Sequence, residues 1–270
     1  MPFARRILHP LGAVAGIGLA WALFEAQWAE LREVEVPLPR LPRELDGLTI
    51  LHLSDFHLGT ASLNGRTLER AVEWAGEGET VDLVLLTGDL LSRAPAQPRL
   101  RAALRRLRAR HGVYAVLGNH DVPAARAALG DGLLEDSSAS VEVRGRRVQI
   151  AGGDPSPGWS GGRLERLADP EADLRILLFH FPDVAQWLPA GAYDLILAGH
   201  LHGGQICVPT PRGKIRLEHL HAPYWEGVHS TPAGMLHVSR GLGTSFVPFR
   251  FLARPEATKL MLRCPTGSTP

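Results

Sequence analysis

Residues 48–57 read LTILHLSDFH, and this stretch shows the pattern from which the fold can be inferred. Its first six residues are mostly apolar, which is typical of a short buried β-strand, and polar residues begin directly after it at Ser54. Asp55 and His57 stand two residues apart, a spacing that in extended backbone points both side chains the same way. The stretch therefore predicts a buried strand with two candidate ligands at its carboxyl end.

The same pattern recurs four times further along the chain. In open α/β sheets, ligands bind in the crevice beyond the carboxyl ends of the strands. We therefore expect the five strand exits to converge on one rim. Gly88-Asp89 follows the apolar run 83–86, Gly118-Asn119-His120-Asp121 follows 113–117, His180 follows 176–179, and Gly199-His200-Leu201-His202 follows 195–198.

Helical patterns at 63–74 and 100–107 alternate with these apolar runs. Alternation of strands and helices predicts an α/β fold with a largely parallel, buried sheet and helices on its faces. A further apolar run lies at 148–150, and the C-terminal part is more purely β in character. The glycines at 88, 118 and 199 fit sharp turns at the strand ends, where a Cβ atom would clash.

The polar residues at the strand ends favour a metal site when they are taken together. Alone, a strand-end aspartate is usually a helix cap, and a single histidine is usually an ordinary polar residue. Oxygen and nitrogen ligands without sulfur suit Mn, Fe, Zn or Co rather than calcium or copper. We expect the two cations to be Mn first, with Fe, Zn, Co or Mg as alternatives. The candidate ligands are Asp55, His57, Asp89, Asn119, His180, His200 and His202.

This set of motifs resembles the calcineurin-like metallophosphoesterase superfamily over about residues 48–262. The resemblance implies a four-layer α/β/β/α sandwich with a dimetal site at the sheet rim. It also implies that Asp55, His57, Asp89 and His202 hold one metal, while Asp89, Asn119, His180 and His200 hold the other. His120 matches the non-ligand histidine that lies beside the scissile phosphate in that family.

Chemistry of this kind predicts a hydrolase for phosphodiester or pyrophosphate bonds. Two cations about 3.5–4 Å apart can activate a shared water as the attacking hydroxide and clamp the phosphoryl oxygens. We expect His120 to stabilise the equatorial oxygens or to protonate the leaving oxygen. Asp121 either orients His120 or caps the helix that Val122-Pro123 would begin.

A narrower resemblance points to a bacterial membrane-anchored branch, whose members are described as phosphodiesterases and some relatives as UDP-2,3-diacylglucosamine pyrophosphatases of lipid A synthesis. It is carried by residues 199–205, Tyr224, Gly227, residues 239–243, Pro248, Arg250 and Pro255-Glu256. It implies a lipid-linked or nucleotide-sugar substrate at the membrane. The alternatives are a broad phosphodiesterase for nucleotides or cell-envelope polymers, and a non-catalytic scaffold of the same fold.

Residues outside the metal set are candidates for substrate contact. The guanidinium forks of Arg240 and Arg250 match phosphate oxygens in shape, although structural roles fit them equally well. Trp159, Tyr224 and Trp225 could line a lipid or nucleobase pocket, or simply pack in loops.

The N-terminus carries an apolar run at residues 11–24 that follows Arg5 and Arg6. It fits an uncleaved signal anchor, a cleaved signal peptide or, less well, a helix buried in the fold. The arginines favour a cytoplasmic N-terminus, which would place the catalytic part outside the cytoplasm. We expect an anchor or signal segment at 1–30, a Pro-rich connector at 31–46, the metallophosphoesterase domain at 47–263 and a tail at 264–270.

Composition excludes several classes of protein. The formal net charge of +1 argues against a scaffold that is held on nucleic acid by bulk electrostatics. Only two cysteines occur, so neither a disulfide framework nor a thiolate zinc site is available. The substrate and the membrane are the expected partners, and nothing in the sequence indicates a protein partner.

Overall fold

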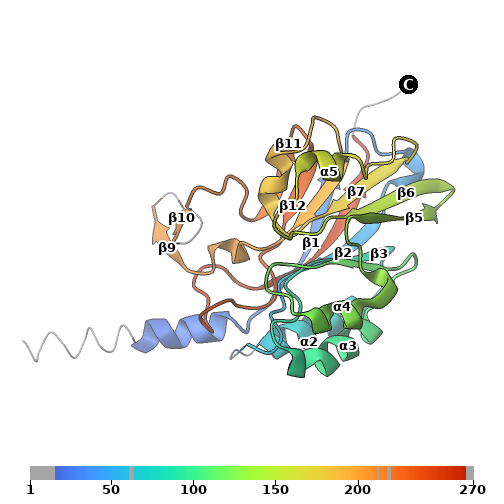
Figure 1. The fold of residues 1–270 in the computed structure, drawn as a ribbon. Helices are drawn as coiled ribbons and strands as arrows, with labels where there is room; N and C mark the ends of the chain where they lie inside the picture. The colour runs from blue at the N-terminus through green and yellow to red at the C-terminus, as the bar shows by residue number, and fades with distance from the viewer. Residues whose placement is uncertain (1–15, 61–63, 212, 218–219, 266–270) are drawn as a thin grey trace, which may run out of the picture.

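A computed structural model of the chain describes residues 16–60, 64–211, 213–217 and 220–265, and its centre is a pair of stacked mixed sheets (Figure 1). The first sheet has five strands in the order β1 (Glu30–Pro37), β13 (Glu256–Arg263), β2 (Thr49–Leu53), β3 (Leu83–Thr87) and β4 (Val113–Val116). The second has six, in the order β11 (Gly227–Thr231), β12 (Gly234–Val238), β8 (Leu195–Ala198), β7 (Leu174–Leu178), β6 (Arg146–Gly152) and β5 (Ser137–Val143).

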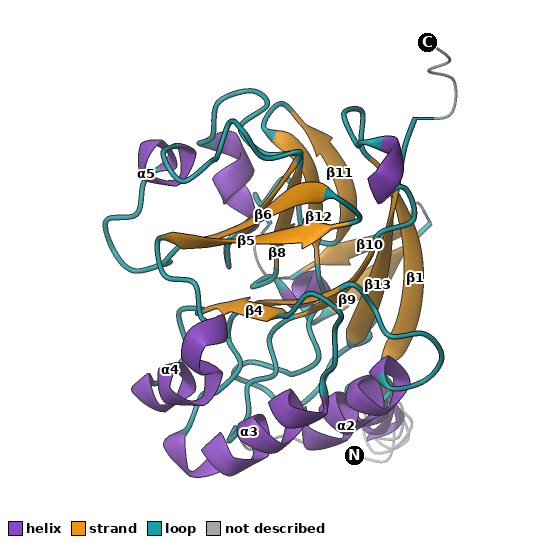
Figure 2. Ribbon diagram, turned by 90° about the vertical axis from the view of Figure 1, so that its right-hand side faces the viewer, coloured by secondary structure: helices purple, strands orange, loops and turns teal. Residues whose placement is uncertain are grey.

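Helices lie on the outer faces of this pair of sheets (Figure 2). The first sheet carries α2 (Asn64–Ala75), α3 (Gln97–Arg106) and α4 (Pro123–Leu129), and the second carries α5 (Gly161–Glu165) and η4 (Pro182–Gln186). The short 3₁₀ turns are η1 (Arg43–Leu45), η2 (Ala94–Ala96), η3 (Gly130–Gly132) and η5 (His202–Gly204), and a separate hairpin comprises β9 (Cys207–Thr210) and β10 (Gly213–Arg216).

Three apolar cores hold the layers together. One lies between the first sheet and its helices, where Leu51 and Leu86 meet Leu68 and Leu100. The second lies between the two sheets, and the third lies between the second sheet and the segments α5 and η4. Alternate residues of a strand face opposite sides, so neighbours such as Ile50 and Leu51 serve different cores. The resulting order is helix, sheet, sheet, helix, as the resemblance implied.

The predicted strands at 48–53, 83–86, 113–117, 148–150, 176–179 and 195–198 all form, and so do both predicted helices. The central strands are parallel, in the runs β2-β3-β4 and β6-β7-β8-β12. Most strand pairings are parallel, as predicted, but they are divided between two sheets rather than gathered in a single one. Antiparallel pairing of β13 with β2, β5 with β6 and β11 with β12 makes both sheets mixed.

The first half of the segment predicted as a connector at 31–46 belongs to the edge strand β1, which ends at Pro37. Strand β1 pairs in parallel with β13 through eight registered residues, from Glu30 opposite Glu256 to Pro37 opposite Arg263. Cross-strand ion pairs from Glu33 to Lys259 and from Glu35 to Arg263 add to this pairing. The sequence did not indicate this strand, because its partner is more than 200 residues away in the chain.

The N-terminal apolar run lies partly outside the described residues, which begin at residue 16. Residues 16–25 form a helix at the side of the molecule (Figure 1). Its Ala22 and the carboxylate of Glu25 contact the segment 250–253, while Ile17 and Phe24 are 71% and 52% exposed. Across the part of the chain that the structure describes, no helix is both long enough and apolar enough to cross a bilayer.

Candidate metal centre

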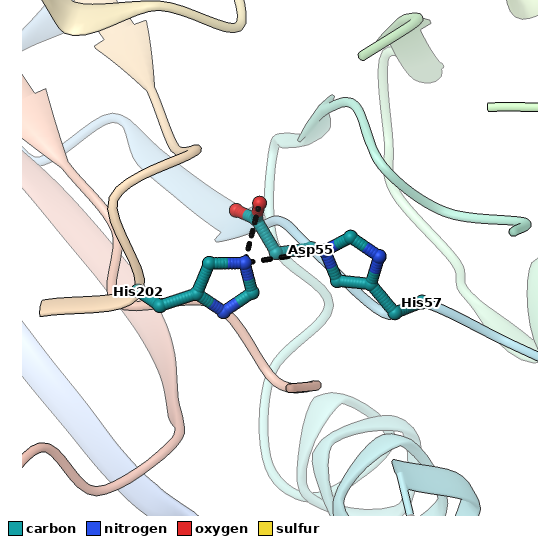
Figure 3. A group of neighbouring side chains, drawn as sticks. All are labelled: Asp55, His57 and His202. Carbon is teal, nitrogen blue, oxygen red and sulfur yellow. Dashed lines mark hydrogen bonds and ion pairs between the residues drawn. The ribbon is translucent and has the colours of Figure 1, made fainter. Parts of the chain in front are cut away.

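The loops that follow β2, β3, β7 and β8 bring six of the seven predicted ligands into two adjacent groups. In each group the candidate ligand atoms lie within 4.8 Å of one another. Figure 3 shows the first group, in which the ring of His202 faces Asp55 and His57. The convergence follows from strand order, because parallel neighbours end at the same edge of a sheet. The groups are Asp55, His57 and His202, and Asp89, His180 and His200.

Asp89 lies between the two groups. Its Oδ2 atom is 3.5 Å from Nε2 of His57 in the first group and 3.3 Å from Nε2 of His180 in the second. The other oxygen, Oδ1, accepts a hydrogen bond of 2.7 Å from the backbone N–H of His120. One buried carboxylate thus faces both groups, which is the position of a ligand that two cations would share.

Backbone strain is concentrated at the same residues. Five of the candidate ligands have a positive φ angle, a conformation uncommon for residues other than glycine although aspartate, asparagine and histidine tolerate it best. Each such residue costs on the order of 1–3 kcal/mol, so the surrounding fold must impose it, and this kind of strain clusters at functional sites. The five are Asp55 (54°), His57 (45°), Asp89 (53°), His200 (74°) and His202 (49°).

Two of the strand-end glycines are needed for close approach rather than for an unusual φ. A Cβ atom on Gly118 would overlap the carboxylate of Asp89, and one on Gly199 would overlap Ser54 and the carboxylate of Asp55. Neither glycine has a positive φ, in contrast to Gly88 with a φ of 90°. The expected sharp turn therefore applies to Gly88, whereas the other two make room for ligands.

The imidazole rings are oriented by contacts on their far nitrogens. Nδ1 of His180 donates to the carbonyl oxygen of Thr87 at 2.7 Å, which leaves Nε2 directed at Asp89. Nδ1 of His57 lies 2.9 Å from the hydroxyl of Ser92. Such contacts set the tautomer and direction of a metal-ligating histidine. Thr87 and Ser92 were missed in the sequence, because a hydroxyl or carbonyl near a strand end carries no distinctive pattern.

The carboxylates of Asp55 and Asp89 are buried, and they shift the pKa values of the groups around them. Burial, together with the neighbouring Asp89 carboxylate, raises the pKa of Asp55 to about 6, although the His180 ring opposes this shift. Burial alone would lower the pKa of His180, but the Asp89 carboxylate outweighs it and raises that pKa to about 9. Burial lowers the pKa of His57 to about 4, so this ring is neutral at pH 7 with a lone pair to offer.

The donor set fits a pair of divalent cations. Nε2 of His180 is buried and forms no hydrogen bond within the described chain, although a buried polar atom normally has a partner. It points at the Asp89 carboxylate, which is itself almost fully buried. Buried charges are paired or coordinate metals. A cation beside Asp89 would satisfy both groups, and a second would do the same for Asp55, His57 and His202.

The loop after β4 carries the remaining candidates. Asn119 and His120 are exposed, and the N–H groups on either side of Asn119 bind Asp121 and Asp89. The ring of His120 lies 5.6 Å from that of His57, centroid to centroid, so it stands beside the first group. The loop therefore presents Asn119 and His120 next to the shared carboxylate.

Asp121 holds this loop in place. Its carboxylate accepts N–H bonds from Gly118 at 2.9 Å and from Leu91 at 2.7 Å, and burial raises its pKa to about 6. The expected alternative of a helix cap is not observed, since α4 starts after Val122 without a side-chain cap. Asp121 instead joins the loops that follow β3 and β4, which positions His120 through the backbone.

The two arginines considered for substrate contact have other partners. Arg240 is only 9% exposed, and its guanidinium pairs with Glu30 at 2.7 Å and Glu256 at 2.8 Å. Arg250 is fully buried and donates to the carbonyl oxygens of His202 and Ala253, so the interpretation of Arg250 as a phosphate contact was wrong. A role for Arg240 in binding substrate stays a prediction that its ion pairs do not favour.

Arg250 also fixes the ring of His202, which the sequence did not indicate. Its Nη2 atom donates to Nδ1 of His202 at 3.1 Å. Because a guanidinium only donates, the proton of the neutral His202 ring resides on Nε2 in this arrangement. For a cation to bind at Nε2, the ring proton would have to move to Nδ1, and the Arg250 contact with Nδ1 would be lost.

Comparison of the sequence with known proteins shows which family this chain resembles. Residues 48–204 match the model of the calcineurin-like phosphoesterases. The chain is similar to YkuE of Bacillus subtilis, an uncharacterised metallophosphoesterase, at 30% identity over 273 residues that cover 92% of this chain and 91% of that protein.

Two further relatives extend the comparison. YkoQ of Bacillus subtilis, also an uncharacterised metallophosphoesterase, is 30% identical over 225 residues, or 78% of this chain and 82% of its own. A Danio rerio protein named as a transmembrane protein with a metallophosphoesterase domain is 30% identical over 265 residues, or 88% of this chain and 58% of its own.

Proposed function

The chain belongs to the calcineurin-like phosphoesterase family, and we propose that it hydrolyses a phosphodiester or pyrophosphate bond with two divalent cations bound at the six Asp and His residues and Asn119. The chain is a metallophosphoesterase by family and by its two His/Asp groups. The bond it cleaves and its substrate are the proposed part. The observation that carries the proposal is the position of Asp89, whose Oδ2 atom faces one histidine of each group.

Two cations held there would supply Lewis acidity for the phosphoryl oxygens and an activated water. The residues of the chain have separate tasks around them. Asp89 sets the spacing of the two groups, and the N–H of His120 fixes the carboxylate in turn. The exposed His120 ring can place a proton at the leaving oxygen or donate to an equatorial oxygen. Asp121 and Gly118 keep the loop of His120 against Asp89.

We propose manganese as the resident metal, with iron, zinc, cobalt and magnesium as alternatives. The support is the chemistry of the donors, since carboxylate and imidazole without thiolate suit these ions. Neither described cysteine belongs to either group, as the free thiols of Cys207 and Cys264 lie elsewhere.

We also propose that the protein works at a membrane, with its catalytic part outside the cytoplasm, on a lipid-linked or nucleotide-sugar substrate like UDP-2,3-diacylglucosamine. The described part of the N-terminal apolar segment supports membrane contact, because Ile17, Trp21 and Phe24 are 71%, 45% and 52% exposed. Exposed apolar groups of this size on one helix favour an interfacial or membrane partner. The Danio rerio relative named as transmembrane supports it further.

A substrate panel tests the reaction. Purified full-length protein is freed of metal, reconstituted separately with Mn, Zn, Fe or Mg, and assayed on bis(p-nitrophenyl) phosphate and on detergent-solubilised UDP-diacylglucosamine. We expect at least one metal to restore turnover of the chromogenic diester, and UMP release to identify the lipid-linked substrate. Turnover of simple diesters and nucleotides without UMP release would favour the broad phosphodiesterase instead.

The non-catalytic scaffold predicts a different outcome of the same panel. A scaffold would bind metal yet leave every ester and pyrophosphate intact with every metal.

Liposome flotation tests the proposed membrane contact of the N-terminal helix. Trp21→Glu combined with Phe24→Glu should abolish flotation while leaving diester turnover unchanged. Flotation that survives both substitutions would contradict the role given to this helix.

A further inference from the structure

We propose that the aromatic pocket beside His200 is a nucleobase subsite, which takes the base of a nucleotide whose phosphate lies at the metal centre. The pocket has a volume of about 450 Å³ and is lined by Trp159, Phe181, Asp183, Gln186, His200 and Tyr224 among others. That volume lies within the range of small-molecule sites, about 300–1,000 Å³. The inference rests on the proposed function, because it assumes that the substrate phosphate is held at the dimetal site.

The pocket adjoins the metal centre directly. The ring of Phe181 lies 4.6 Å from that of His200, centroid to centroid and nearly perpendicular, and 5.2 Å from that of His180. Both histidines belong to the second candidate metal group. A group in this pocket is therefore separated from a phosphate at the centre by a short spacer, as a base is by its pentose.

The aromatic walls are held in place by neighbouring structure. Trp159 packs against the fully buried Phe179, with ring centroids 4.9 Å apart. Tyr224 lies in the loop before β11, and its ring packs against that of His229 with centroids 5.2 Å apart. Fixed aromatic faces suit a flat π-system, because any nucleobase can stack on them regardless of the hydrogen-bonding groups on its edge.

The polar groups of the pocket match the edge of a base. Asp183 and Gln186 both belong to the 3₁₀ turn η4 and are three residues apart, a spacing at which side chains eclipse in such a turn. A carboxylate accepts N–H bonds, and a carboxamide both accepts and donates. The Asp183 charge also disfavours a second phosphate here, which leaves a neutral hydrogen-bonding ring as the fitting occupant.

An acyl chain fits this pocket less well. Asp183 and Gln186 are exposed at the edge of the pocket, where they can hydrogen-bond to a base but offer an acyl chain no apolar contact. The two occupants make opposite predictions for a matched set of substrates. The set consists of four phosphodiesters that all release p-nitrophenol. The phosphate that remains after hydrolysis is adenosine 5′-phosphate, uridine 5′-phosphate, ribose 5-phosphate or dodecyl phosphate.

The experiment uses full-length, manganese-reconstituted protein and two readouts. Calorimetry compares adenosine and uridine 5′-monophosphates with ribose 5-phosphate, and kinetics give kcat/KM for the four esters. We expect at least one nucleotide to bind on the order of tenfold more tightly than ribose 5-phosphate, with a similar advantage in kcat/KM for its ester. Trp159→Ala and, independently, Tyr224→Ala should bring both ratios towards one and leave the ribose phosphate values within about twofold.

Trp187→Ala is the control, since this tryptophan directly follows η4, is 66% exposed and is not among the lining residues. Equal binding of nucleotides and ribose 5-phosphate, or preference for the dodecyl ester, would overturn the inference. So would unchanged ratios in both pocket variants. If nucleotides bind with the expected advantage but no ester is cleaved, the pocket stands and the proposed hydrolysis fails. If all esters are cleaved equally, the hydrolysis stands and the pocket fails.

Discussion

Asp89→Asn should remove most of the stability that metal ions give the protein. The carboxylate lies within 3.5 Å of histidines from both groups, so its charge acts on both cations. A ligand present at about 100 times its Kd adds about 2.7 kcal/mol to the free energy of unfolding. Two ions would add about 5 kcal/mol, which corresponds to a rise in Tm of about 10–20 °C for a chain of this size.

Calorimetric scans of chelated protein, with and without manganese, measure this rise directly. We expect wild type to gain the full amount and Asp89→Asn to gain only a few degrees, each measured against its own metal-free scan. The metal-free Tm of Asp89→Asn should itself be lower at pH 7, because the substitution removes the carboxylate that pairs with the protonated His180 ring. Asp131→Asn, an exposed substitution in η3, serves as the control and should behave as wild type. A variant Asp89→Asn with the full metal-dependent rise would refute the idea of a shared ligand.

Three other perturbations test separate parts of the site. Gly118→Ala should fold yet lose bound metal, measured by elemental analysis, because its Cβ would displace the shared carboxylate; Gly162→Ala has room for the new atom and should retain metal. Ser92→Ala should weaken metal affinity about 10–100-fold in a chelator competition, since it removes the contact that orients His57. Apparent metal affinity should rise about tenfold per pH unit between pH 6 and 8, because the His180 pKa of about 9 means that a cation must displace its proton; a flat profile would contradict that assignment.

The location of the site was predictable because it depends on strand ends. Each candidate ligand follows a short apolar run, and parallel strands bring such ends to one edge whatever the loops between them do. Asp55, Asp89 and His180 could therefore be placed together from one sequence. The glycines were predictable as well, although for Gly118 and Gly199 the physical reason is room for a carboxylate rather than a turn.

Other features depended on contacts that one sequence does not reveal. Strand β1 pairs with β13 near the far end of the chain. Antiparallel pairing of β13 with β2 in the first sheet, and of both edge strands in the second, makes the sheets mixed. Arg250 carries a charge, yet it is fully buried among backbone carbonyls, which reverses the usual expectation for arginine. The positive φ angles of the ligands also depend on the whole fold, because no local pattern of Asp or His requires them.

Metal stoichiometry tests the central claim most directly. Elemental analysis of correctly folded, full-length protein, after reconstitution and removal of free ions, should find two divalent cations per chain, and both should be depleted by Asp89→Asn. A folded wild-type preparation that binds no divalent cation would contradict the account. So would a stoichiometry of two that Asp89→Asn leaves intact.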